Sequence, residues 1–161
     1  MRIQVSAIGR LKSGPERELA SHYVTRAGAS GRSLGLTSIA IVEHPESTAI
    51  EERQRREEEG RRLLSGLSPG AKLIALDETG RSLSSEKFAE MIRSEIEGGT
   101  GTLAFLIGGP DGLSDSVRES ARGGILSLGR MTWPHRLARV MIAEQIYRAV
   151  TILVKHPYHR A

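Results

Sequence analysis

The residues best suited to chemistry lie in the last 32 positions of the chain. From Arg130 to Ala161 there are six Arg or Lys side chains, three of the five histidines and a single acid, Glu144. Six bases against one acid give this segment a net charge of +5, whereas the 17 bases and 18 acids before it nearly cancel. Positive charge beside His and Tyr side chains is typical of a site that binds a polyanion and moves a proton. A solvated basic tail is the plainer alternative.

His135 is the histidine with the most specific predicted position. It follows Trp133-Pro134 and is expected in the first turn of the closing helix, where the helix dipole disfavours the imidazolium form. A neutral imidazole at this point can orient the edge of a base or accept a proton, although an ordinary surface histidine fits the same pattern. A metal site is not indicated, because His156 and His159 have no third ligand in evidence.

Three predicted strands end in residues that suit a ligand site. One runs directly into Asp77-Glu78, a second into the glycine-rich segment 106–112, and a third into residues 126–132. Ligands collect at the carboxyl ends of parallel strands, and glycines let the backbone approach them closely. The glycine-rich segment lacks the features of a P-loop or a dinucleotide fingerprint, so neither ATP nor NAD is indicated. A tight turn and an acidic loop are the plainer interpretations, and no Ser-His-Asp arrangement is evident from spacing.

The elements that position these residues follow an α/β pattern. Apolar runs of strand length alternate with helical patterns, which favours a mainly parallel sheet flanked by helices. The last helix has an apolar stripe formed by Leu137, Val140, Met141, Ile146, Val150 and Leu153. We expect strands over residues 2–8, 38–42, 72–76, 102–107 and 125–128, helices over 15–26, 47–64, 86–96 and 134–154, and a loop over 27–35.

Composition limits the class of protein further. A chain of 161 residues suggests one domain, residues 1–161, and the lack of cysteine excludes disulfides, thiolate metal sites and Cys nucleophiles. No apolar run approaches the roughly 20 residues of a membrane span. The first residues do not form a signal peptide, so we expect a cytoplasmic protein without membrane contact. A net charge of +4 permits a nucleic-acid partner but does not require one.

Four ordered motifs resemble the ribosomal RNA large subunit methyltransferase H family of the SPOUT class. They are Leu106-Ile107-Gly108-Gly109-Pro110-Asp111-Gly112, Thr132-Trp133-Pro134-His135, Ala143-Glu144-Gln145-Ile146-Tyr147-Arg148-Ala149 and His156-Pro157-Tyr158-His159-Arg160. The similarity is dense from Lys72 onward and thin before it, apart from the opening strand and Gly9-Arg10-Leu11-Lys12. Trp133 and Asp111 depart from the residues usual in the family, which puts the shape of the pocket in question.

The resemblance implies a fold with a C-terminal trefoil knot that holds S-adenosylmethionine (SAM). It implies methylation of N3 of a pseudouridine in 23S rRNA within the assembled 70S ribosome, by a homodimer in which the tail of one subunit, here Tyr158, His159 and Arg160, completes the site of the other. The residues implied for cofactor binding are Leu76, Gly108, Gly109, Leu128, Gly129, Arg130, Met131, Thr132, Trp133 and Pro134.

The chemistry of that reaction suggests roles for the basic residues. Methyl transfer from a sulfonium is an in-line displacement, so an enzyme mainly positions the two reactants and excludes water. N3 of pseudouridine is protonated at neutral pH and needs a base or a cation that favours its ionised form. We therefore expect His135 or His159 to accept the proton and Arg160 or Arg139 to stabilise charge. Tyr158 is expected to stack on the base or hydrogen-bond to it.

Two other functions remain open at this stage. One is a binding protein for RNA or the ribosome that has kept the fold and lost turnover; it has no need of an intact cofactor pocket. The other is a knotted methyltransferase acting on tRNA. The short chain argues against it, because it leaves no room for an appended RNA-binding domain.

Overall fold

The computed structural model of the protein describes residues 1–158. Its centre is a five-stranded sheet in which every neighbouring pair of strands runs parallel, in the order β2-β1-β4-β3-β5. The strands are Arg2–Ile8 (β1), Ser38–His44 (β2), Lys72–Ser82 (β3), Thr102–Ile107 (β4) and Ile125–Ser127 (β5). The helices are Pro15–Gly31 (α1), Glu52–Ser65 (α2), Ser85–Glu97 (α3), Asp115–Ser120 (α4) and His135–Leu153 (α5), with a short 3-10 helix over Arg32–Leu34. The predicted α/β architecture with a parallel sheet is confirmed.

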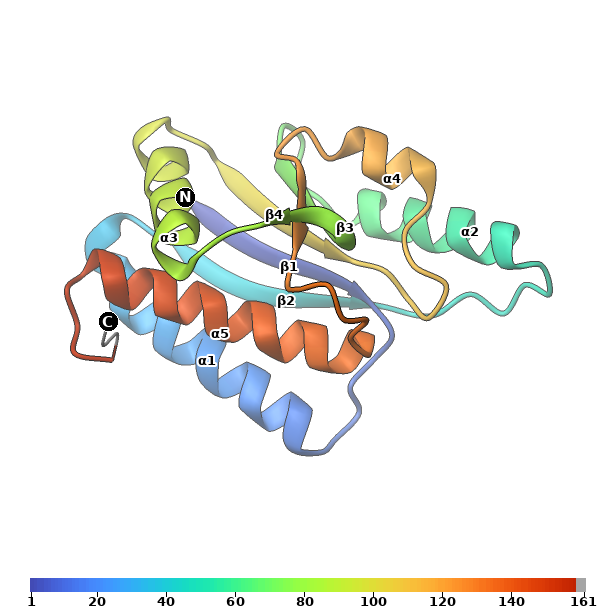
Figure 1. The fold of residues 1–161 in the computed structure, drawn as a ribbon, viewed down its shortest axis with the longest axis horizontal. Helices are drawn as coiled ribbons and strands as arrows, with labels where there is room; N and C mark the ends of the chain where they lie inside the picture. Colours follow the sequence, from blue (N-terminus) through green and yellow to red (C-terminus); the bar gives the residue numbers. More distant parts are fainter. Residues whose placement is uncertain (159–161) are drawn as a thin grey trace.

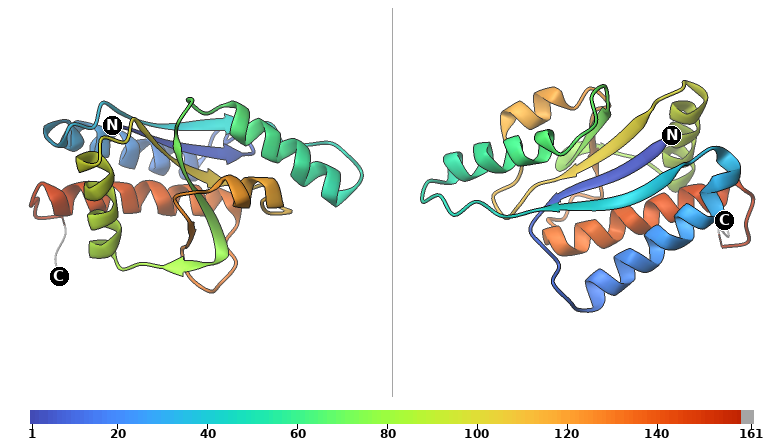
Figure 2. Two further views of the ribbon diagram at one scale, coloured as in Figure 1. Left: turned by 90° about the horizontal axis from the view of Figure 1, so that it is seen from above. Right: turned by 180° about the vertical axis from the view of Figure 1, so that it is seen from behind.

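Helices cover both faces of the sheet, as Figures 1 and 2 show. Helices α1, α3 and α5 pack on one face, and α2 and α4 pack on the other. The central strand β4 is buried along its whole length, which explains why its six residues form an unbroken run of buried side chains with no polar alternation. Helices α1 and α5 lie side by side in all views (Figures 1 and 2).

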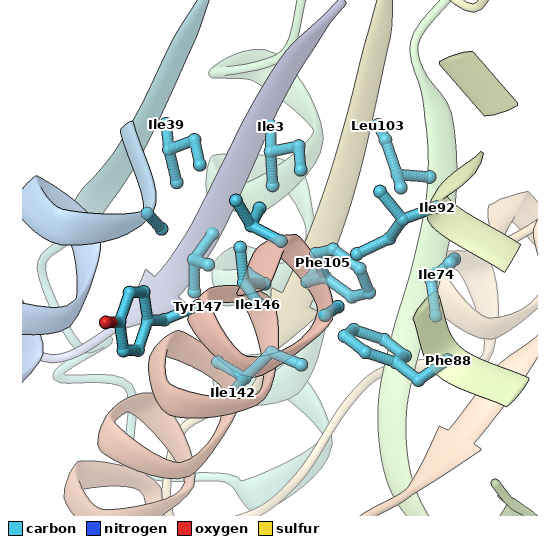
Figure 3. Close-up of a cluster of buried hydrophobic side chains, with 14 of the residues drawn as sticks. Ile3, Ile39, Ile74, Phe88, Ile92, Leu103, Phe105, Ile142, Ile146 and Tyr147 are labelled. Atoms are coloured by element: carbon cyan, nitrogen blue, oxygen red, sulfur yellow. The ribbon is translucent and has the colours of Figure 1, made fainter. Parts of the chain in front are cut away.

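The larger core lies between the sheet and the three helices on its first face. Figure 3 shows the side chains of β1 and β4 meeting those of α5 and α3 there. The rings of Phe88 and Phe105 lie 5.7 Å apart within this core. Apolar burial on this scale fixes α5 against the sheet and so fixes the position of its first residue, His135.

Several predicted boundaries need correction. The loop predicted over 27–35 is wrong, because α1 continues to Gly31 and a 3-10 turn follows it. Gly31 allows Leu36 to pack closely against the helix, because a Cβ at this position would lie 2.7 Å from Leu36 Cδ1. The helix predicted from residue 47 begins only at Glu52. Helix α4 was not predicted, and Leu137, predicted in the apolar stripe, is 41% exposed.

Strand β3 is longer than predicted and irregular at its centre. Its pairing with β5 shifts between Leu76 and Arg81, both of which lie opposite Leu126. Residues 77–80 therefore leave the ladder as a bulge, a feature that commonly redirects side chains near a functional site. Gly80 is required there, because a Cβ would lie 2.7 Å from the carbonyl carbon of Ile125. The trefoil knot stays a prediction.

Candidate active site

The three predicted strand ends meet at one pocket of about 770 Å³. It lies at the carboxyl edge of the parallel sheet, where β4, β3 and β5 are neighbours in that order. His135 lies at this pocket together with nine of the ten residues predicted to bind a cofactor. Those nine are Leu76, Gly108, Gly109, Leu128, Gly129, Met131, Thr132, Trp133 and Pro134.

Arg130 is the one predicted cofactor residue that does not line the pocket, and its side chain is exposed. Its neighbours Met131 and Trp133 do line the pocket and are 72% and 40% exposed. Large apolar side chains left open to solvent at a pocket are typical of a surface that a ligand covers. Trp133, one of the two departures from the family pattern, therefore forms part of the pocket wall.

The bulge in β3 supplies the acidic side of the pocket. A carboxylate oxygen of Asp77 accepts hydrogen bonds from the backbone and hydroxyl of Thr79, and its other oxygen pairs with Arg118 at 2.8 Å. Burial alone raises the pKa of Asp77, but the Thr79 hydrogen bonds and the Arg118 charge outweigh it and leave this pKa below its usual value. Glu78 lies further out, where it accepts a hydrogen bond of 2.9 Å from the Thr132 hydroxyl.

The glycine turn after β4 forms the wall on the other side. Gly112 N donates to Gly109 O at 3.0 Å, which closes the turn. A Cβ on Gly108 would lie 2.6 Å from the Gly112 carbonyl, so only glycine permits this close approach. Asp111, the second departure from the family pattern, is held from outside by Arg55, whose Nε and Nη2 donate to it at 2.6 and 3.2 Å.

His135 is the first residue of α5 and lines the pocket. Burial lowers its pKa below 6.5, the carboxylate of Glu46 at 3.8 Å opposes this, and the charges of Arg139 and Arg136 lower it again. The net effect keeps the imidazole neutral near pH 7, as predicted from its place in the helix. The main cause is burial, which the sequence did not indicate.

The position of Arg139 does not suit its predicted role of stabilising charge on a substrate. Its side chain is completely buried, Nη1 donates to Glu43 and Nη2 donates to Ile8 O at 2.9 Å. It does not line the pocket. These contacts join the start of α5 to the ends of β1 and β2, so Arg139 anchors the helix and is not directed into the pocket.

Tyr158 packs on α5 of its own chain. Its hydroxyl donates to Glu144 Oε1 at 3.1 Å, and its ring lies 4.6 Å from that of Tyr147. Burial, followed by the hydrogen bond to Glu144, raises the pKa of Tyr158 to about 12, so the phenol stays protonated. His159 and Arg160, the other predicted residues of the tail, lie outside the described residues.

Several residues of the site were not predicted. They are Glu46 beside His135, Glu43 beside Arg139, Arg118 beside Asp77, and Arg55 and Glu59 behind the glycine turn. Arg55 and Glu59 belong to a run of alternating charges on α2 that is typical of a solvated helix face, and only the tertiary contacts distinguish them from their neighbours.

Within residues 1–158, no group of three His, Asp or Glu side chains is arranged to hold a metal ion. In the same part of the chain, no helix combines the length and apolar character needed to cross a bilayer.

Comparison with known proteins agrees with this fold. Residues 1–159 match the family described as "Predicted SPOUT methyltransferase", which defines the class of protein. Ribosomal RNA large subunit methyltransferase H from Xanthobacter autotrophicus is 53% identical over 161 residues, 100% of both chains. The protein of the same name from Beijerinckia indica is 47% identical over the same 161 residues, again 100% of both chains. The chain therefore belongs to the ribosomal RNA large subunit methyltransferase H family, which confirms the resemblance of its motifs.

A solved structure gives a more distant match. The SpoU methyltransferase AviRb from Streptomyces viridochromogenes, in complex with the cofactor AdoMet, is 16% identical. The match covers 97% of this chain and 58% of that chain with a TM-score of 0.41, which is too low to support any conclusion about this site.

Proposed function

We propose that this protein transfers a methyl group from SAM to N3 of a pseudouridine in 23S rRNA within the assembled 70S ribosome. One observation carries the proposal. In a chain 53% identical to a ribosomal RNA large subunit methyltransferase H along its whole length, nine of the ten residues implied for the cofactor and a neutral histidine line one pocket. Such an enzyme works in the cytoplasm, where its substrate is.

The residues of the pocket fit SAM. Backbone groups at the glycine turn and at residues 128–134 suit the edges of an adenine, and the apolar walls of Leu76, Ile107 and Leu128 suit its faces. Asp77 and Glu78 place negative charge beside a cofactor that is positively charged at sulfur and at its amino group. Bound SAM supplies an electrophilic methyl group, and the chain's own residues must orient the acceptor and remove its proton.

His135 is the best-placed residue for that proton. Its neutral imidazole lies at the pocket, with Nε2 3.8 Å from Glu46 Oε1. Loss of the N3 proton to His135 creates an imidazolium, and the carboxylate of Glu46 stabilises that charge. Arg139 is already paired with Glu43, which leaves Arg160 as the candidate to stabilise the ionised base.

The position of Tyr158 supports a homodimer. In its own chain Tyr158 contacts Glu144, nine residues along α5 from His135. At 1.5 Å per residue this separates Glu144 from the pocket by about 13 Å along the helix axis. A Tyr158 that touches the acceptor base at one pocket must therefore come from a second copy of the chain. His159 and Arg160 would accompany it.

Methyl transfer from labelled SAM to ribosomes that lack the modification tests the proposal. Label in 23S rRNA that disappears with His135→Ala supports it. No label from a protein that binds SAM would contradict it and would favour a different acceptor, such as tRNA; a failure to bind SAM would favour the binding-only alternative.

A further inference from the structure

We propose that Arg10, Lys12 and Arg136 form a phosphate-binding rim beside the pocket, and that this rim binds the backbone of the rRNA substrate. The inference deepens the proposed function and rests on it. Arg10 and Lys12 belong to the loop that joins β1 to α1, and Arg136 is the second residue of α5. In Figure 1 this loop passes the start of α5.

The loop is held rigidly from within. Gly9 N donates to His44 O at 2.9 Å, and Leu11 is only 5% exposed. Arg17 Nη1 donates to the carbonyl oxygens of Leu11 and Lys12 at 3.0 and 2.8 Å. A loop fixed by a buried Leu and a guanidinium presents its remaining side chains in a defined direction, so less conformational entropy is lost when they bind a ligand.

The loop begins at the edge of the active site. Gly9 has a φ of +86°, and a Cβ added to it would lie 3.2 Å from His135 Nε2. Arg10 therefore follows a residue that lies beside the proposed base and Glu46, and Arg136 is the residue after that base. The rim and the pocket share this boundary, but none of the three rim residues lines the pocket.

The cations of the rim are available for a partner. All three side chains are exposed, and within residues 1–158 none of them makes a hydrogen bond or an ion pair. Of the two acids at this edge of the pocket, Glu43 is paired with the buried Arg139, and the half-exposed Glu46 lies 3.8 Å from the His135 ring. Exposed, unpaired Arg and Lys side chains are the groups that neutralise RNA phosphates.

The start of α5 strengthens the positive potential. Helices α1 to α4 each have an acid in the first turn, whereas α5 has none and no side-chain cap. The positive end of the α5 dipole therefore carries only His135 and Arg136 as its first side chains, with no acid to offset it. Glu16 and Glu18 offset the dipole of the neighbouring α1, so the phosphate is expected on the α5 side of the rim.

The test compares ribosome affinity with cofactor affinity in charge-removed variants. We would measure binding of the full-length protein to 70S ribosomes over a range of salt concentrations, the KM for ribosomes in methyl transfer, and the Kd for SAM. The variants are R136Q and the double variant R10Q/K12Q, and R32Q is the matched control because Arg32 is exposed at the far end of α1.

If the rim binds rRNA phosphates, removal of each charge should weaken ribosome binding by about two- to five-fold. This is the change in affinity expected for the loss of one solvent-exposed ion pair. The slope of log affinity against log salt should fall by about 0.7 to 0.9 for each phosphate that the variant no longer neutralises. SAM affinity should stay unchanged in every variant, and R32Q should bind ribosomes like the wild type.

The other possible outcomes separate failure of the rim from failure of the proposed reaction. Normal ribosome affinity in R136Q and R10Q/K12Q overturns the rim and leaves the proposed function standing. Loss of SAM affinity alone assigns these cations to the cofactor and also overturns the rim. Rim-dependent ribosome binding without methyl transfer by the wild type keeps the rim and overturns the proposed reaction. No ribosome binding by the wild type overturns both.

Discussion

The buried carboxylate of Glu59 lies directly behind Gly109 of the glycine turn. A Cβ added to Gly109 would lie 2.7 Å from Glu59 Oε2 and 3.0 Å from Ile8 Cγ2. The other oxygen of Glu59 accepts a hydrogen bond of 2.9 Å from Ser47 N, so the carboxylate is fixed. The wall of the pocket thus rests on α2, and only glycine leaves room for that packing.

Gly109→Ala should therefore cost stability and cofactor affinity together. Overpacking of this kind typically destabilises by about 1–3 kcal/mol, and relief of the clash would push the turn into the pocket. Gly28→Ala is the matched control, because Gly28 lies within α1 with open space around it and should gain about 0.5–1 kcal/mol. Denaturant unfolding and SAM titration measure both effects. A Gly109→Ala variant as stable as Gly28→Ala, with normal SAM affinity, would show that the turn does not depend on Glu59.

The pKa of His135 predicts the pH dependence of methyl transfer. Only the neutral imidazole accepts a proton, and its pKa lies below 6.5. The rate should be insensitive to pH near 7 and should fall below that pKa as the ring becomes charged. His135→Gln should lose this acidic limb and about 10²–10⁴-fold in rate, and should recover partly at alkaline pH, where N3 ionises without a base. If the acidic limb of the pH–rate profile persists in His135→Gln, the group that titrates there is not His135.

Replacing Arg139 should affect stability more than chemistry. Arg139→Met removes the partner of Glu43 and the bond to Ile8 O, and loss of one partner of a buried pair costs about 3–5 kcal/mol. Since Glu43 is 28% exposed, the lower end of this range is expected. Adding Glu43→Gln should restore part of the stability. Full stability combined with a loss of turnover would instead give Arg139 the charge-stabilising role that its sequence position suggested.

The proposed homodimer predicts that two inactive variants complement each other. His135→Ala and Tyr158→Ala should each abolish methyl transfer as homodimers while SAM binding survives in Tyr158→Ala. A mixed dimer contains one site with an intact His135 and an intact tail from the other subunit. Co-expression should therefore recover about a quarter of wild-type activity, since half of the dimers are mixed and each has one complete site. Activity that stays absent in the mixture would place the tail at its own chain's pocket.

The fold could be predicted well where local sequence and burial agree. The bounds of β1 and β4 are those predicted, because β1 alternates apolar and polar residues, β4 is a short apolar run, and each ends at a glycine. The pocket could be located because parallel strands bring their carboxyl ends to one edge, which gathers segments such as Asp77-Glu78 and 106–112.

The remaining features depend on contacts between distant parts of the chain. Arg139 and Glu43 are 96 residues apart, and nothing in the sequence around either residue indicates a buried pair. Glycines such as Gly28 and Gly31 often interrupt helices, but packing of Ala27 and Gly31 against the core keeps this segment helical. Tyr158 was predicted at a substrate site, whereas within its own chain aromatic and charged side chains of α5 hold it.

The central claim is tested most directly by mapping the methylated nucleotide. Labelled SAM would be supplied with the protein to unmodified 70S ribosomes and, separately, to free 23S rRNA, and the product would be located by mass spectrometry. The account predicts label at N3 of a single pseudouridine in ribosomes and little or none in free rRNA. Label on another nucleotide, on tRNA, or equally on free 23S rRNA would contradict it.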